Sequence, residues 1–211
     1  KLLQELLEPD SVVAISGGST MAAVAEEMPI LPFNPTVVPA RGGVGAVVEY
    51  QANVIASVLA ERLRGTYKML HLPDGLSQDS LHMLMTCEPQ IKEISDLISR
   101  TDVLLFGIGT AMHMADQRHI ADEVRKQLVD NHAVGEALGQ YCDMDGKLIY
   151  STNNIGLSLP DVAKVPNVIA VAGGQEKASA IIGVMRACQK GILIIDEQAA
   201  EGMRQLLQIS A

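Results

Sequence analysis

Glycine-rich segments of this chain contain the residues whose types and spacing could bind an anion. They are Ser16–Thr20 (SGGST), Arg41–Gly45 (RGGVG), Gly107–Gly109 (GIG) and Gly173–Gly174. Glycine lets backbone N–H groups come close to an anion, and a following helix presents its positive N-terminal end. The pattern predicts phosphate binding, although an ordinary tight turn capped by Ser19 or Thr20 uses the same residue types. The candidate ligands in the first two loops are Gly17, Gly18, Ser19, Thr20, Arg41, Gly42 and Gly43.

Three basic side chains accompany these loops. Arg41 directly precedes two glycines, Arg118 follows the GIG loop, and Lys177 follows Gly173–Gly174. Arginine binds phosphate as a planar fork and lysine as a point charge, so both suit this role. A single basic residue is usually a solvated surface group, and the hypothesis therefore depends on all three lying at one edge of the fold. Gln51 and Glu136 are candidate acceptors for the hydroxyl groups of a sugar.

Motifs of several other functions are missing from the sequence. No GxGxxG motif follows a strand, no GK[ST] ends a glycine loop, and no serine lies in a GxSxG pattern. His113 and His119 are six residues apart, which is not a ligand spacing for one helix face, and we predict neither a metal nor a cofactor. The scattered cysteines Cys87, Cys142 and Cys188 are expected to be reduced thiols.

The elements that would position the loops are short apolar runs that alternate with helical patterns. Strands are predicted over residues 11–16, 36–40, 67–72, 102–106, 167–172 and 191–195, and helices over about 20–28, 49–64, 80–85, 91–99, 119–129, 178–185 and 197–207. Residues 131–161 are expected to leave the sheet, with a hairpin turn at Asp143–Gly146. These repeated units predict an α/β fold, a Rossmann-like parallel sheet with helices on both faces, forming one domain over residues 1–211. Ligands of such sheets bind at the carboxyl ends of the strands.

The composition is that of an acidic folded chain. Of 211 residues 48% are hydrophobic, and the formal net charge is −9. An acidic surface is unsuited to DNA phosphates, so any DNA-reading part is expected outside this chain. The first residue is Lys1 rather than Met, which favours a fragment of a longer protein. No apolar run reaches the roughly 20 residues of a membrane helix, and we predict a cytoplasmic protein without membrane contact.

The ordered set of these segments resembles the sugar-binding domain of the SorC (deoxyribonucleoside-regulator-like) family of bacterial transcription regulators. The resemblance covers nearly the whole chain, and within the family the opening LLQELLEPDSVVAISGGST and the VGEALGQY segment are most similar to regulators of glycolytic genes. The residues that carry it are Ile15–Thr20, Ala40–Gly43, Gln51–Asn53, Asp102–Gly109, Val134–Glu136, Gly156–Val168, Ala170–Ala180 and Ile195–Ala199.

That resemblance implies a fold shared with glucosamine-6-phosphate deaminase, ribose-5-phosphate isomerase and CoA transferases. It implies a helix-turn-helix domain before this chain, operator DNA as that domain's partner, a homo-oligomer, and fructose-1,6-bisphosphate as the effector. Carried over residue by residue, Gln51 and Glu136 would face the sugar. The wider family often has Gly-Asp where this chain has Gly135-Glu136, which changes the reach of the carboxylate. The phosphate-binding positions would be Gly18, Ser19, Thr20, Arg41, Gly42, Gly43, Arg118 and Lys177.

Two alternatives use the same fold. A sugar-phosphate isomerase or deaminase would need a positioned general base, and Glu136 is the best candidate. The Asp-Gly-Ala-Asp-Glu segment of ribose-5-phosphate isomerases is missing, as is the deaminases' Asn-Glu-Pro segment. One carboxylate without partners is not an acid–base set, so we predict a sensor and not an enzyme. A pure oligomerisation module is the second alternative, and the basic residues at glycine loops argue against it.

Overall fold

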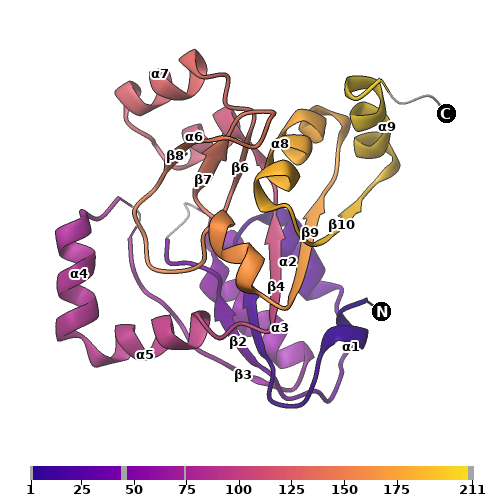
Figure 1. Cartoon of the computed structure of the whole chain (residues 1–211). Coiled ribbons are helices and arrows are strands. Elements are labelled where there is room, and N and C mark those ends of the chain that lie inside the picture. The colour runs from indigo at the N-terminus through magenta and orange to yellow at the C-terminus, as the bar shows by residue number, and fades with distance from the viewer. Residues whose placement is uncertain (1, 44–46, 74, 209–211) are drawn as a thin grey trace.

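A six-stranded parallel sheet forms the centre of the protein (Figure 1). The structure is a computed structural model that describes residues 2–43, 47–73 and 75–208. The strand order is β10-β9-β4-β1-β2-β3, and every neighbouring pair is parallel. The prediction of a parallel, helix-covered α/β sheet is confirmed. The strands are β1 (Val12–Ile15), β2 (Thr36–Pro39), β3 (Thr66–Tyr67), β4 (Val103–Gly107), β9 (Asn167–Ala172) and β10 (Ile192–Ile195).

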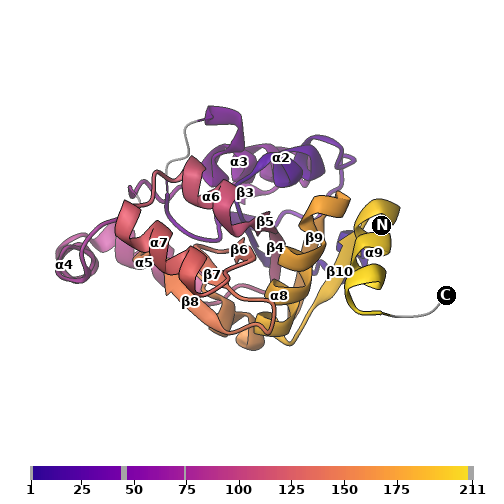
Figure 2. The same cartoon turned by 90° about the horizontal axis from the view of Figure 1, so that it is seen from above.

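Helices cover both faces of this sheet (Figure 2). The α-helices are α1 (Leu2–Leu6), α2 (Ser19–Glu26), α3 (Ala52–Arg62), α4 (Gln78–Cys87), α5 (Pro89–Ile98), α6 (Ala111–Gln117), α7 (Asp122–Asp130), α8 (Ala178–Cys188) and α9 (Glu197–Leu206). Three 3-10 helices are also described, namely η1 (Val48–Tyr50), η2 (Leu159–Lys164) and η3 (Gln175–Lys177).

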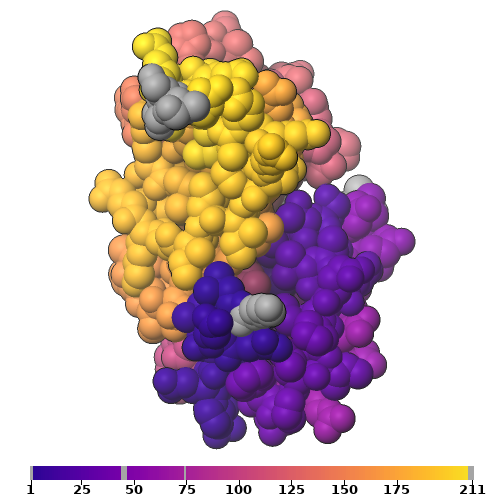
Figure 3. Space-filling model, turned by 90° about the vertical axis from the view of Figure 1, so that its right-hand side faces the viewer, coloured from indigo at the N-terminus to yellow at the C-terminus, as the bar shows by residue number. Residues whose placement is uncertain are grey.

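The central strands are apolar on both faces because each face has its own hydrophobic core. In β4, Leu104 and Phe106 belong to the core under α5, α8 and η2, while Val103 and Leu105 belong to the core under α1, α2 and α3. Side chains alternate between the faces of a strand, so an unbroken aliphatic run is what a doubly covered strand requires. The segments near the two ends of the chain border each other on the surface (Figure 3).

A small antiparallel sheet projects beyond the carboxyl ends of the central strands. It consists of β5 (Gly109–Thr110), β6 (Gly135–Ala137), β7 (Gln140–Cys142) and β8 (Leu148–Ser151), in that order. The predicted excursion of residues 131–161 contains β6, β7 and β8 of this sheet and the segment that follows them, whereas β5 lies earlier in the chain. The predicted turn at Asp143–Gly146 joins β7 to β8, and Gly146 has the positive φ of 85° that such a tight turn favours.

The strand predicted over residues 67–72 is wrong for most of its length, because β3 ends at Tyr67. The Asn53 side chain takes the place of a neighbouring strand for Leu70. Its Oδ1 accepts a hydrogen bond from Leu70 N at 2.9 Å, and its Nδ2 donates one to Leu70 O at 3.1 Å. Leu70 and Leu72 are buried, which explains the apolar pattern, but an amide side chain satisfies the backbone instead of a sheet.

The helix predicted over residues 119–129 begins later, at Asp122, and a further helix, α6, precedes it. The chain turns between them at His119, whose φ is +49°. The helix predicted over residues 49–64 is divided into η1 and α3, since Gln51 has an extended backbone. No helix in the described ranges is long and apolar enough to cross a membrane.

Candidate functional site

The first glycine loop joins β1 to the N-terminus of α2. Gly18 is the N-cap of α2, so the alternative interpretation, in which Ser19 or Thr20 caps the helix, is wrong. Gly18 has a φ of +111°, and its N–H donates to Tyr50 O at 2.9 Å. This donor is therefore occupied. The N–H groups of Ser19 and Thr20 lie in the first turn, where a helix has no internal acceptors for them, and they remain suited to an anion.

Close packing places η1 against this loop. A Cβ added to Gly17 would lie 2.7 Å from Tyr50 O, so the approach of the two backbones requires glycine there. Gln51 follows Tyr50 directly and is the N-cap residue of α3. The structure therefore brings Gln51 next to the first glycine loop, although the two are more than thirty residues apart in the sequence.

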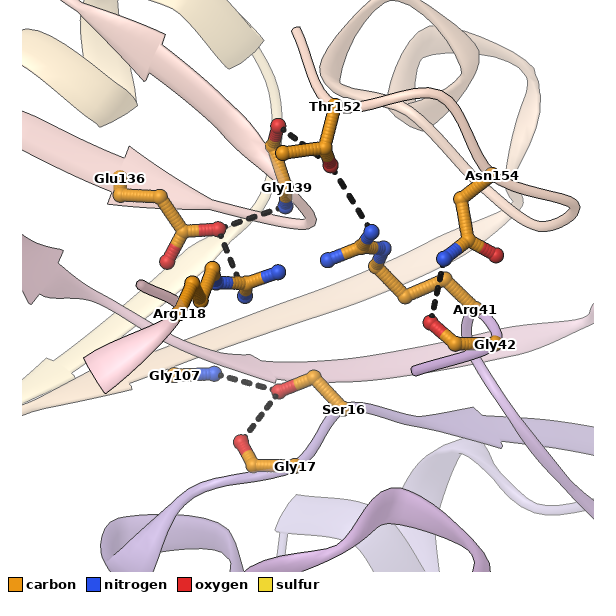
Figure 4. A network of polar contacts seen from close by, with 10 residues as sticks. All are labelled: Ser16, Gly17, Arg41, Gly42, Gly107, Arg118, Glu136, Gly139, Thr152 and Asn154. Atoms are coloured by element: carbon orange, nitrogen blue, oxygen red, sulfur yellow. Dashed lines mark hydrogen bonds and ion pairs between the residues drawn. The ribbon is translucent and has the colours of Figure 1, made fainter. Parts of the chain in front are cut away.

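Ser16 connects the ends of two neighbouring central strands. Its hydroxyl accepts a hydrogen bond from Gly107 N at 3.1 Å and donates one to Gly17 O at 3.1 Å (Figure 4). Ser16 is buried at the end of β1, and Gly107 is the last residue of β4. The hydroxyl thus fixes the first glycine loop relative to the GIG loop.

Arg41 lies just beyond β2 and is 7% exposed. Its Nη2 donates to Thr152 Oγ1 at 2.9 Å, and Thr152 in turn donates to Gly139 O at 3.1 Å. A Cβ at Gly139 would lie 2.6 Å from the Arg41 guanidinium carbon, and one at Gly156 would overlap the Arg41 Cα. The arginine side chain is therefore held between two positions that tolerate only glycine.

Arg118 and Glu136 form a second charged group at the same edge. Arg118 Nη2 lies 3.0 Å from Glu136 Oε1, with the two side chains 18% and 4% exposed. Gly139 N donates to the same carboxylate oxygen at 2.6 Å. Figure 4 shows the guanidinium groups of Arg41 and Arg118 reaching toward each other from opposite sides. Two planar forks that converge in this way can bind the oxygens of one phosphate or of two neighbouring anionic groups.

The small sheet is what positions Glu136. Its Cα is paired with that of Gly109 in β5 and with that of Tyr141 in β7. The GIG loop therefore continues directly into the strand beside Glu136. Arg118 is the C-cap residue of α6, the helix that follows β5. It therefore reaches the Glu136 carboxylate from the end of a helix and not from a neighbouring strand. Sequence reasoning named Arg118 and Glu136 separately, and the fold brings them into contact.

Several residues of this site were not singled out in the sequence. Asn154 Nδ2 donates to Gly42 O at 2.8 Å, which holds the second glycine loop. A cavity of about 50 Å³ lies beside Arg41. The only sequence signal for this segment is a run of small polar residues after a strand, which is typical of any loop. The residues that line the cavity are Arg41, Leu138, Gln140, Thr152, Asn154, Gly156, Leu157 and Ser158.

Lys177 is the last residue of η3, after the carboxyl end of β9. Because β9 is the neighbour of β4, Lys177 belongs to the same edge of the sheet as the GIG loop. Strands β4 and β1 separate β9 from β2, so Lys177 and Arg41 belong to different parts of this edge. Gly43 is the last described residue before 44–46, and Val44 and Gly45 of the second loop lie outside the described residues.

Asp196 holds the loop that leads to Lys177. Its carboxylate accepts from Gly174 N at 2.9 and 3.1 Å and from Ala199 N at 2.8 Å, where it is the N-cap of α9. One side chain therefore orients a glycine loop and the start of a helix.

We expect Asp196→Ala to lower the free energy of unfolding by about 1 kcal/mol, the usual cost of a lost N-cap. It should also weaken ligand binding, because the loop before Lys177 loses its anchor. Asp196→Asn keeps one acceptor oxygen and is expected to lose less. Urea unfolding followed by circular dichroism measures the difference. Equal stability of the wild type and Asp196→Ala would contradict the anchoring role.

The remaining candidates for chemistry are not brought together. Within residues 2–43, 47–73 and 75–208, no group of three or more His, Cys, Asp and Glu side chains could hold a metal ion. All three cysteines are free, and burial raises the pKa of the Cys142 thiol to about 12. Glu136, the candidate general base, is bound to Arg118 and Gly139 N. A carboxylate held in this way orients other groups more readily than it moves protons.

The fold and this edge define a class of protein, an α/β domain whose glycine loops and basic side chains lie at the carboxyl edge of a parallel sheet, where such folds bind small ligands. Comparisons with known proteins give the family. The model of a family described as "Putative sugar-binding domain" matches residues 1–205. The central glycolytic genes regulator of Bacillus subtilis is 40% identical over 193 residues, which cover 90% of this chain and 56% of that protein.

Solved structures agree with this result. A "putative SorC family transcriptional regulator" from Enterococcus faecalis is 39% identical and superimposes with a TM-score of 0.87 over 96% of this chain and 83% of that one. The full-length sorbitol operon regulator of Klebsiella pneumoniae has a TM-score of 0.84 over 96% of this chain and 67% of its own, and at 23% identity it shows the fold alone.

The chain belongs to the family of sugar-binding domains of SorC-type transcription regulators. It spans 56% and 58% of the length of two curated relatives at 40% identity, so it corresponds to a part of those proteins. Both curated relatives are named as regulators of central glycolytic genes, and the family model describes the matched part as a sugar-binding domain.

Proposed function

We propose that this domain binds a phosphorylated sugar, with fructose-1,6-bisphosphate as the first candidate, at the carboxyl edge of the central sheet. The convergence of Arg41 and Arg118, from elements far apart in the sequence, carries the proposal. Arginine forks match the oxygens of a phosphate group. The start of α2 offers a second place for an anion, and Lys177 a further positive charge at the same edge.

Glu136 explains why the ligand would be a sugar phosphate and not inorganic phosphate. Both hydrogen bonds that it accepts from described residues end on Oε1, so Oε2 can accept a sugar hydroxyl. A carboxylate repels a phosphate, but it binds hydroxyl donors well. Gln51, beside the first glycine loop, is a second group for the sugar. The proposed ligand residues are Gly17, Gly18, Ser19, Thr20, Arg41, Gly42, Gly43, Gln51, Arg118, Glu136 and Lys177, with Gly17 and Gly18 shaping the turn.

The longer protein would use this binding to modulate operator DNA. DNA contact would come from a helix-turn-helix domain outside this chain, because the chain itself is acidic. The relatives named in glycolytic and sorbitol regulation support a repressor that responds to a sugar metabolite. Such repressors read paired half-sites, so we also propose a cytoplasmic homo-oligomer whose subunit contacts respond to the ligand.

Thermal unfolding at fixed protein concentration tests the proposal. A ligand that binds only the folded state stabilises it by about 2.7 kcal/mol at a hundred times its dissociation constant. We expect the largest rise in melting temperature with fructose-1,6-bisphosphate, a smaller rise with fructose 6-phosphate, and almost none with fructose. Mass spectrometry should recover the sugar phosphate unchanged. If no sugar phosphate raised the melting temperature, the ligand proposal would be wrong and an oligomerisation module would be the better explanation.

A further inference from the structure

Tyr141 is the largest side chain that the fold buries completely at this edge of the molecule. It lies in β7 with an exposed fraction of 0%, and its hydroxyl oxygen has no hydrogen-bond partner in the described structure. Leaving a buried hydroxyl without a partner costs about 1–3 kcal/mol. Native proteins rarely retain such a group unless a water molecule or a ligand satisfies it.

The register of the small sheet places Tyr141 among the charged residues of the site. Its Cα is paired with that of Glu136, and directly paired residues of antiparallel strands have side chains on the same face. The ring packs on α6 and α7 with Ala111, Ala115 and Leu128. Burial raises the pKa of the Tyr141 hydroxyl, Glu136 raises it further, and Arg118 and Arg41 lower it. All three charged groups therefore lie within electrostatic reach of this hydroxyl.

The phenol is a donor whenever the site is in use, because the raised pKa keeps it protonated at neutral pH. The neighbouring arginines are donors only, so they cannot accept its hydrogen. Glu136 Oε2 accepts no hydrogen bond from a described residue, but the structure has no hydrogen bond from the Tyr141 hydroxyl to it or to any other described group. The Tyr141 hydroxyl therefore has an unused donor that an oxygen of a bound ligand can accept.

We infer that Tyr141 is a ligand-contacting residue whose hydroxyl donates a hydrogen bond to an oxygen of the phosphorylated sugar, at the inner end of the site between Arg41 and Arg118. The inference rests on the proposed function. The hydroxyl is closed to solvent, so the contact forms only when the residues around it rearrange as the ligand binds. A contact that exists only in the bound arrangement favours that arrangement, as a regulatory ligand requires.

Tyr141→Phe is the test, and Tyr150→Phe is the matched control. Tyr150 lies opposite Tyr141 in β8, with ring centroids 5.9 Å apart, but is only half-buried. We expect Tyr141→Phe to weaken fructose-1,6-bisphosphate binding at least about fivefold in calorimetric titration, which corresponds to one lost hydrogen bond. Without ligand its melting temperature should equal or exceed that of the wild type, since it removes a hydroxyl with no partner. Tyr150→Phe should keep wild-type affinity.

Tyrosine fluorescence gives a readout that a merely structural role would not change. The chain has four tyrosines and no tryptophan, so its emission comes from tyrosine alone. Ligand addition should change this emission in the wild type and in Tyr150→Phe, and much less in Tyr141→Phe.

The inference would be overturned if Tyr141→Phe kept the wild-type affinity and had a lower melting temperature without ligand. That result would mean that the hydroxyl is hydrogen-bonded to a buried water molecule. That result leaves the proposed function intact, because the wild type would still bind. Absence of binding by the wild type would instead remove the proposed function itself. In that case a stable Tyr141→Phe variant would show only that the hydroxyl has no partner in the folded protein. The proposed contact between Tyr141 and the ligand would then be wrong as well.

Discussion

Replacing Arg41 with alanine is expected to weaken fructose-1,6-bisphosphate binding by one to two orders of magnitude. A hydrogen bond to a charged group contributes about 1.5–3 kcal/mol, and each 1.4 kcal/mol is a tenfold change in affinity. Arg41 is 7% exposed and oriented by Thr152, so little entropy is lost when its guanidinium binds a phosphate. Lys177→Ala should weaken binding within the same range, and isothermal titration calorimetry measures both.

Two further variants make this test specific. Arg41→Lys keeps the charge but loses the fork, and we expect it to recover only part of the affinity. Lys92→Ala removes one exposed positive charge on α5, away from the carboxyl edge, and should bind as the wild type does. If Arg41→Ala and Lys177→Ala both retained full affinity, the proposed site would be wrong.

Replacing Glu136 with alanine is expected to cause the largest loss of stability among the charged residues of the site. The change leaves the Arg118 guanidinium without this carboxylate and Gly139 N without its acceptor. Removing one partner of a buried ion pair costs about 3–5 kcal/mol. Because the Arg118 side chain is still 18% exposed, we expect about 3 kcal/mol, measured as the free energy of unfolding in urea.

Two further variants test whether the loss of stability in Glu136→Ala comes from the lost charge interactions or from the lost packing of the side chain. Glu136→Gln keeps an acceptor oxygen for both donors and should lose less than half as much stability as Glu136→Ala. Adding Arg118→Met to Glu136→Ala removes the largely buried charge that has lost this carboxylate, and should restore part of the lost stability. A double variant that is less stable than Glu136→Ala would mean that the carboxylate acts mainly through other contacts.

Local sequence was sufficient for the central strands and for most of the loops at their carboxyl ends. The aliphatic runs of β1, β4 and β9 can only be buried on two faces, which requires a parallel sheet under helices. The glycine loops after β1 and β4 were likewise expected from residue type and position. The motifs also indicated a binding domain, because the sequence has one candidate general base, Glu136, without the partners that acid–base catalysis needs.

Local sequence was misleading where a tertiary contact replaced a regular pattern. Leu70 and Leu72 have the apolar spacing of a strand, but Asn53, seventeen residues earlier, takes the place of a neighbouring strand by bonding Leu70. The N-cap of α2 is Gly18, whose N–H donates to Tyr50 O in a distant segment, and Ser19, the better N-cap by residue type, is the first helical residue.

The sequence by itself determined the class of fold, the acidic net charge and the presence of glycine-rich loops with basic residues beside them. Only the tertiary structure decided which of these residues meet. Arg41 is positioned by Thr152, which is 111 residues away, and Glu136 by β5 and β7 of a sheet whose strands have two to four residues each. Such short strands have no distinctive period, and their pairing is set by packing between distant segments, which residue types alone do not encode.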